Sequence, residues 1–138
     1  MRFTYVPVLR ALAALKNGEP QKAIDLLQSA VRYELAVPGS WFGFFGFLYP
    51  AYVRGEAYLA LRKYAEATAE YRKILNHRGL VFCDPVGALA WWRLGNALSL
   101  SGDAPNAKAA YQEFFTLSKE ADPDIPILKQ AKAEFAKL

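Results

Sequence analysis

ALAWWRLGNALSLSGDAPNAKAAY, residues 88–111, is the stretch that decides the fold. Apolar side chains recur every three or four residues on both sides of the turn sequence Ser101-Gly102-Asp103, which is the period of an α-helix. Two helices joined by so short a turn form an antiparallel hairpin. The stretch also holds adjacent tryptophans, Trp91 and Trp92, whose side chains leave a helix about 100° apart. Only one of them can lie at the centre of the buried face.

The same pattern occurs three times along the chain. RALAALKNGEPQKAIDLLQSA, RGEAYLALRKYAEATAEYRKI and LGNALSLSGDAPNAKAAYQEF align at two small-residue slots that are twelve residues apart. The first slot holds Ala11, Gly55 and Gly95, the second holds Ala23, Ala67 and Ala107, and a large side chain follows at Leu27, Tyr71 and Tyr111. Repeated helical hairpins of this kind stack into a solenoid.

Turn and capping residues set the expected helix bounds. The sequence predicts seven helices and no strand, over residues 4–17, 20–34, 50–61, 64–75, 85–100, 104–120 and 125–137. The last has one apolar face, formed by Ile127, Leu128, Ala131 and Phe135, which suits a helix that covers the end of a stack. We therefore expect an all-α fold: a right-handed α-solenoid of three hairpins plus a C-terminal capping helix. It forms one domain over residues 1–138, with repeats at about 4–36, 48–76 and 85–120.

Composition narrows the class of protein. The chain has 138 residues, of which 54% are hydrophobic and 22% charged, as in a soluble globular domain. The 17 basic and 13 acidic residues give a charge of +4 and are scattered, so we expect no nucleic-acid partner. The most apolar run, residues 41–53, is short and broken by glycine and proline, so we expect no membrane insertion. A cytoplasmic location is preferred, although the single cysteine, Cys83, leaves the compartment open and a membrane-anchored parent protein stays an alternative.

The third repeat resembles a known family, the tetratricopeptide repeat. The family pattern W-x2-L-G-x2-Y, followed by A-x3-F, is matched at Trp91, Leu94, Gly95, Leu98, Ala107 and Tyr111. The second alanine slots are 44 and 40 residues apart instead of 34, so residues are inserted between repeats. These insertions and the ending KEADPDIPILKQAKAEFAKL resemble the repeat regions of bacterial eukaryotic-like serine/threonine protein kinases and related signalling proteins. Because no kinase motif is found in this sequence, the resemblance implies a non-catalytic, regulatory or accessory part.

The resemblance also implies a concave groove that binds a protein segment. Trp91 takes the family's tryptophan slot and should pack within its own hairpin, whereas Trp92 should face the groove as a binding hot spot. The alternative is that Trp92 packs against a neighbouring repeat or the aromatic insertion. We expect the groove to be lined by Tyr52, Glu56, Leu59, Trp92, Arg93, Asn96 and Ser99. Arg93 and Asn96 match positions of the family's carboxylate clamp, but Tyr52, Val53 and Glu56 replace its other basic and amide residues, so we do not expect that clamp.

A second candidate surface is the aromatic loop PGSWFGFFGFLYP, residues 38–50. Most of it is expected to fold back onto the hairpins, because so much exposed apolar surface would make the protein associate. Trp41 and Phe42, at its apex, are the residues that we expect to stay available for contact. A self-association module that uses such aromatic surfaces, giving a homo-oligomer, is the alternative to a scaffold for a different protein.

The sequence offers little support for an enzyme, a metal or a cofactor. HRGLVFCD, residues 77–84, holds the only histidine and the only cysteine, too few ligands for a metal site and without a second motif. No carboxylate pair, catalytic triad or phosphate-binding loop has a suitable spacing, so we expect no catalytic activity and no cofactor. Arg10 and Arg54 stand where the family has apolar residues, either paired within the protein or free to meet a ligand carboxylate.

Overall fold

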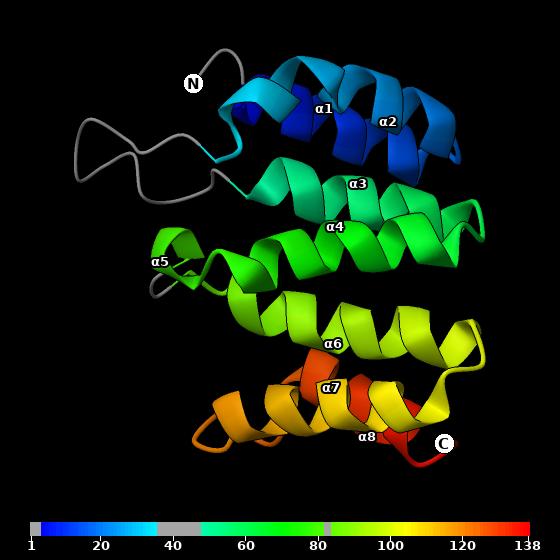
Figure 1. Ribbon diagram of the computed structural model, residues 1–138, viewed down its shortest axis with the longest axis vertical. Coiled ribbons are helices and arrows are strands. Elements are labelled where there is room, and N and C mark those ends of the chain that lie inside the picture. Colours follow the sequence, from blue (N-terminus) through cyan, green and yellow to red (C-terminus); the bar gives the residue numbers. More distant parts are fainter. Residues whose placement is uncertain (1–3, 36–47, 82–83) are drawn as a thin grey trace.

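The structure is a computed structural model that describes residues 4–35, 48–81 and 84–138. All the regular secondary structure in these ranges is helical (Figure 1). The elements are α1 (Tyr5–Lys16), α2 (Pro20–Leu27), η1 (Gln28–Tyr33), α3 (Tyr49–Ala60), α4 (Tyr64–Asn76), α5 (Arg78–Val81), α6 (Val86–Leu100), α7 (Ala104–Leu117) and α8 (Pro126–Phe135).

Three antiparallel hairpins, α1–α2, α3–α4 and α6–α7, stack along the long axis, and α8 packs on the last of them (Figure 1). This confirms the predicted all-α solenoid with a C-terminal helix. Besides small shifts in helix bounds, such as α7 ending at Leu117, two details differ from the prediction. The second helix changes to 3₁₀ geometry at Gln28, and the single turn α5 was not expected, because four residues are too few to show a helical period.

The three hairpin turns share one backbone conformation. In each, the second residue after the helix adopts a left-handed conformation, at Gly18 (φ 75°), Arg62 (φ 58°) and Gly102 (φ 88°). The next N–H reaches back five residues, as Lys63 does to the carbonyl of Tyr58 at 2.9 Å. This Schellman arrangement satisfies carbonyls at the helix end, and glycine adopts it without strain. The turn signals read from the sequence therefore mark real helix ends.

Close packing inside two hairpins depends on glycine. A Cβ added at Gly55 would lie 2.6 Å from a ring carbon of Tyr71, and one at Gly95 would lie 2.8 Å from the ring of Tyr111. Both tyrosines are fully buried. The first hairpin has Ala11 and Leu27 at the equivalent positions, a larger residue opposite a smaller one. Helix separation in each repeat is thus set by a complementary pair, not by one residue alone.

We predict that Gly55→Ala destabilises the protein by about 1–3 kcal/mol through overpacking against Tyr71. In a Tyr71→Leu background, which imitates the first hairpin, the same change should have little further effect. Urea unfolding of the single and double variants measures this coupling. Gly79→Ala is the control, since nothing lies within 4 Å of its added Cβ. Additive effects of the two substitutions would show that the close approach does not set the packing.

Candidate functional site

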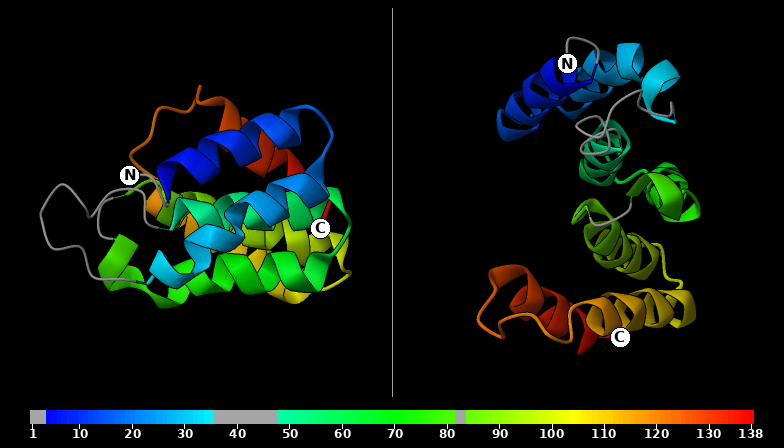
Figure 2. Two further views of the ribbon diagram at one scale, coloured as in Figure 1. Left: turned by 90° about the horizontal axis from the view of Figure 1, so that it is seen from above. Right: turned by 90° about the vertical axis from the view of Figure 1, so that its left-hand side faces the viewer.

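The stack is concave on one side. In the right-hand view of Figure 2, α1 and α8 project to the same side, and α3 and α6 lie set back between them. The second helices of the hairpins, α2, α4 and α7, lie on the opposite, outer side. The first helices of the three hairpins therefore provide the concave face, and α8 bounds it at the C-terminal end.

On α1, the concave face is apolar and open. Arg10 and Ala13 line a pocket with Leu26 of α2, which shows that this flank of α1 faces its own hairpin partner. Leu12 lies on the opposite flank, and Leu9 lies between the two flanks on the solvent side of the helix; their exposed fractions are 46% and 66%. Aliphatic side chains this exposed, three residues apart on one helix, form a surface that a partner can cover.

On α3 and α6, the concave face becomes polar. Tyr52, Glu56 and Leu59 are half-buried on α3, and Asn96 and Ser99 are half-buried on α6. All five are residues that the sequence predicts to line the groove, and their helical spacing places each set along one side of its helix. That they bind a partner stays a prediction.

An ion pair joins these two helices. Arg93 donates from Nε and Nη2 to both carboxylate oxygens of Glu56, each at 2.6 Å. Tyr71 Oη donates to Glu56 Oε1 at 2.5 Å. Burial, reinforced by the charge of Glu56, raises the pKa of Tyr71, so its hydroxyl stays a donor. Burial alone would lower the pKa of Arg93, but the hydrogen bonds to Glu56 outweigh it and raise that pKa. Two expected groove residues are thus already bound to each other.

Trp92 is not in an open groove, and this expectation was wrong. Its exposed fraction is 7%, and its indole N–H donates to Glu134 Oε2 of α8 at 2.9 Å. Leu128 and Ala131 of α8 are buried in the same apolar cluster. The alternative named a neighbouring repeat or the aromatic insertion as the element that covers Trp92, whereas the structure has the capping helix α8 there. Nothing in the sequence links Trp92 to Glu134, which is 42 residues away.

Trp91 points about 100° away from Trp92 around the axis of α6. It is half-buried and packs against the cluster that includes Leu94, Leu98 and Ala110, as expected for a residue that holds its own hairpin together. Of the two adjacent tryptophans, the one expected to be free is therefore the more deeply buried. The reason is α8, which adds a second packing surface to α6.

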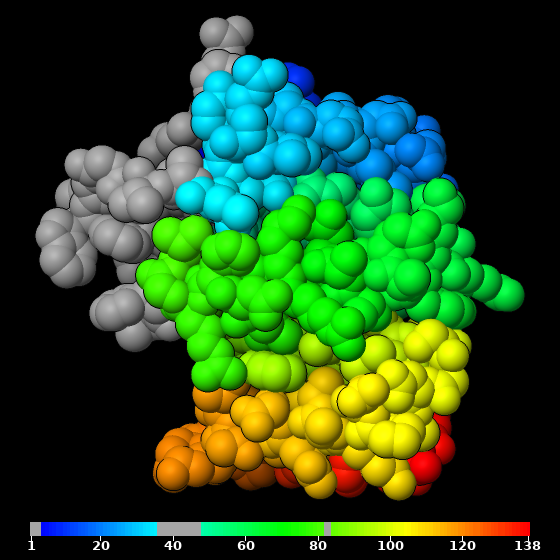
Figure 3. Space-filling view, in the orientation of Figure 1, coloured from blue at the N-terminus to red at the C-terminus, as the bar shows by residue number. Residues whose placement is uncertain are grey.

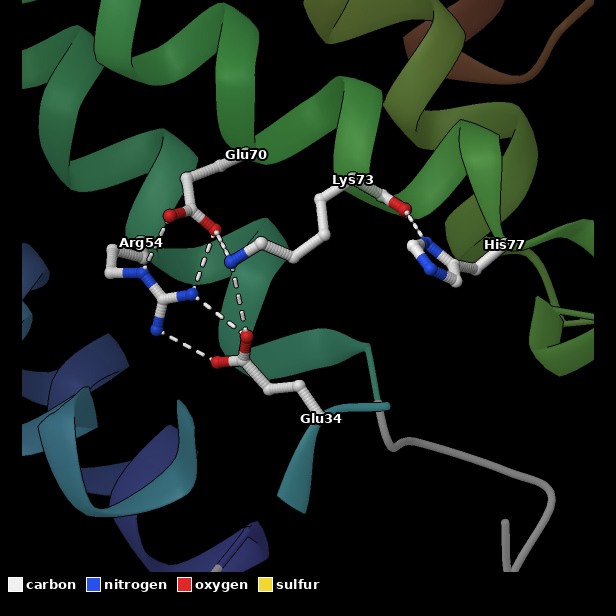
Figure 4. A network of polar contacts seen from close by, with 5 residues as sticks. All are labelled: Glu34, Arg54, Glu70, Lys73 and His77. Atoms are coloured by element: carbon white, nitrogen blue, oxygen red, sulfur yellow. Dashed lines mark hydrogen bonds and ion pairs between the residues drawn. The ribbon is translucent and has the colours of Figure 1, made fainter. Parts of the chain in front are cut away.

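A second network, missed by sequence reasoning, joins the first hairpin to the second (Figure 4). Arg54 of α3 is 3% exposed and Glu34, just after η1, is 1% exposed. Arg54 donates to both oxygens of Glu34, at 2.8 and 3.0 Å, and to both oxygens of Glu70 of α4, at 3.0 and 2.7 Å. Lys73 bonds both carboxylates, at 3.3 and 3.0 Å. Of the two interpretations of Arg54, internal pairing is correct.

The remaining candidates from the sequence are His77, Cys83 and the aromatic-loop residues Trp41 and Phe42. His77 Nδ1 lies 2.7 Å from the carbonyl oxygen of Lys73, and Cys83 lies outside the described residues. No cluster of potential metal ligands occurs in the part of the chain that the structure describes. Trp41 and Phe42, the expected contacts of the aromatic loop, also lie outside it. Within residues 4–35, 48–81 and 84–138, every helix is too short or too polar to cross a membrane.

The comparisons with known proteins agree with this architecture. The family model described as "Tetratricopeptide repeat" matches residues 52–123, more than half of the chain. The chain belongs to the tetratricopeptide repeat family. No curated protein and no solved structure matches it. Tetratricopeptide repeats generally mediate protein–protein interactions and are typically non-catalytic, which directs attention to the surfaces of this repeat domain.

Acid should weaken this tetratricopeptide domain through Glu70. Burial alone would raise the pKa of Glu70, but Arg54 and Lys73 hold it below its usual value of 4.5. The unfolded chain therefore takes up a proton more readily, and the stabilisation is complete above about pH 4.5 and is lost as the pH falls through the folded-state pKa. We predict that Glu70→Gln costs about 1.5–3 kcal/mol at pH 7 and progressively less below pH 4.5, by urea unfolding. Exposed Glu66→Gln is the control. A difference independent of pH would contradict this role.

The position of Trp92 leads to a stability prediction. Trp92→Ala should lower the free energy of unfolding by about 3–5 kcal/mol, because it empties a buried site beneath α8 and removes one donor to Glu134. Circular dichroism during urea titration measures it. Leu100→Ala at the exposed end of α6 should change stability by less than about 0.5 kcal/mol. If Trp92→Ala changed the free energy of unfolding as little as Leu100→Ala does, Trp92 would instead be assigned to the groove.

Proposed function

We propose that this tetratricopeptide domain is a non-catalytic scaffold that binds a segment of a partner protein on its concave face. The observation that carries the proposal is the open apolar flank of α1, with Leu9 66% and Leu12 46% exposed beside the polar faces of α3 and α6. Repeat solenoids use such extended concave surfaces for recognition. Exposed apolar residues grouped on one face are a common mark of an interaction site.

The chemistry of the face indicates what kind of segment fits. Leu9 and Leu12 favour aliphatic or aromatic side chains. Asn96 and Ser99 offer uncharged donors and acceptors at the other end, and the charges of Glu56 and Arg93 are balanced by each other. The proposed ligand is therefore a segment that is apolar where it meets α1 and polar but not strongly charged where it meets α6.

The domain's place in a larger protein is also part of the proposal. The resemblance of the insertions and of the C-terminal segment supports a regulatory or accessory role in a signalling protein such as a serine/threonine kinase. In that setting, the concave face would bring a substrate or regulator to a catalytic domain elsewhere. Self-association is the alternative, and the same open flank of α1 supports it, since a second copy could cover Leu9 and Leu12.

We predict that Leu9→Glu weakens a concave-face ligand by at least about tenfold, because a carboxylate would have to be buried against an apolar side chain. The probe is a peptide selected from a random twelve-residue display library on the wild-type domain, titrated by fluorescence anisotropy. Asn96→Ala should weaken it less.

Val31→Glu is the matched control, because Val31 is also an exposed aliphatic residue, 45% exposed, but lies on η1. Selected peptides that bind Leu9→Glu as tightly as the wild type would contradict the concave-face site. Light scattering that shows a dimer, converted to monomer by Leu9→Glu, would favour self-association instead.

A further inference from the structure

A groove lies on the outer side of the stack, over α6 and between α4 and α7. Two pockets of about 360 and 270 Å³ adjoin there, since Leu75 and Trp91 line both. In Figure 3 the atoms of α6 show as a narrow band between those of α4 and α7. This groove is on the side opposite the concave face (Figure 2), so it is separate from the surface proposed above.

The floor of the groove is apolar. Trp91 of α6 is its largest side chain and stays half-buried, although it packs against a cluster with residues from α4, α6 and α7. Small residues, Ala88 on α6 and Ala109 and Ala110 on α7, line the groove beside it. Small neighbours leave room for a bulky side chain of a ligand, and a tryptophan that is partly open to solvent is a frequent anchor in protein interfaces.

The two walls carry opposite charges. Arg72 of α4 and Arg78 of α5 line one wall, both exposed, and neither forms an ion pair with another described residue. Glu113 of α7 lines the facing wall and is also exposed without such a pair. Asp84, at one end, is 8% exposed, accepts the N–H of Val86 at 3.0 Å and interacts with Tyr49. The available charge on the α4–α5 wall is therefore positive.

We infer that this groove binds a second protein segment, one that places a large apolar side chain on Trp91 and acidic side chains beside Arg72 and Arg78. Glu113 repels acidic groups from the α7 wall and so sets which way the segment lies. A nucleic-acid strand suits the groove less well, because its phosphates would meet Glu113 as well as the arginines. A domain with both surfaces holds two segments at once, one on each side.

Two display libraries test the charge requirement. Both present ten-residue peptides with a fixed central phenylalanine, flanked by Asp and Glu in one library and by Lys and Arg in the other. The acidic library should enrich on the wild-type domain and the basic library should not. By fluorescence anisotropy, an enriched acidic peptide should bind the double variant Arg72→Glu/Arg78→Glu at least about tenfold more weakly, and should bind Glu113→Gln about two- to threefold more tightly.

Controls separate this site from the concave face. The three substituted residues are exposed, so the variants should fold, which circular dichroism checks. Arg10→Glu, an exposed arginine on α1, and Leu9→Glu should both leave the acidic peptide's affinity unchanged. Affinity that is lost in Leu9→Glu but kept in Arg72→Glu/Arg78→Glu would overturn the outer site and support the concave one. Equal enrichment of both libraries, or displacement of the peptide by a thymidine oligonucleotide, would also overturn the inference.

Discussion

A buried guanidinium is the contact on which the arrangement of the first two hairpins depends. Arg54 lies between Glu34, at the end of the first hairpin, and Glu70, on the second helix of the next. Removing charges from water is unfavourable, and it is offset here because Lys73 completes a neutral set in which the carboxylates accept several hydrogen bonds. The network can form only when η1, α3 and α4 meet in one relative position. The relative position of η1, α3 and α4 therefore also fixes the shape of the concave face between α1 and α3.

The next two contacts along the stack also depend on a carboxylate that accepts hydrogen bonds from neighbouring helices. Glu56 accepts hydrogen bonds from Tyr71 and from Arg93, and so connects α3, α4 and α6. Glu134 of α8 accepts them from Trp92 and Tyr111, and so connects α6 and α7 to the capping helix. At each of these two joints, a carboxylate accepts a hydrogen bond from the hydroxyl of a tyrosine that packs on a glycine of the facing helix. Small residues bring the helices close enough for these bonds, and the bonds specify which helix is the neighbour.

These joints also decide which surfaces are left for partners. Glu56, Arg93 and Trp92 are engaged within the stack, so the open part of the concave face moves toward α1, where Leu9 and Leu12 are exposed. On the outer side, α4 and α7 are held apart by α6, and Trp91 lies at the base of the groove between them. The two tryptophans of α6 therefore have different roles. Trp92 packs against the capping helix α8, and Trp91 forms the floor of a groove that is open to solvent.

The amino-acid sequence by itself determined the hairpins, their turns and the glycine slots, because these depend on neighbours within one or two helical turns. The period of apolar residues, the glycines at 18 and 102 and the spacing of twelve between small-residue slots all carry that local information. Only the tertiary structure decided the partners of Arg54, Arg93 and Trp92, which lie 16 to 42 residues away in sequence. The repeat pattern aligns equivalent positions of successive hairpins, but it does not indicate which of their side chains meet. A side chain's exposure on a repeat helix depends on which element is stacked against it, and for Trp92 that element is α8.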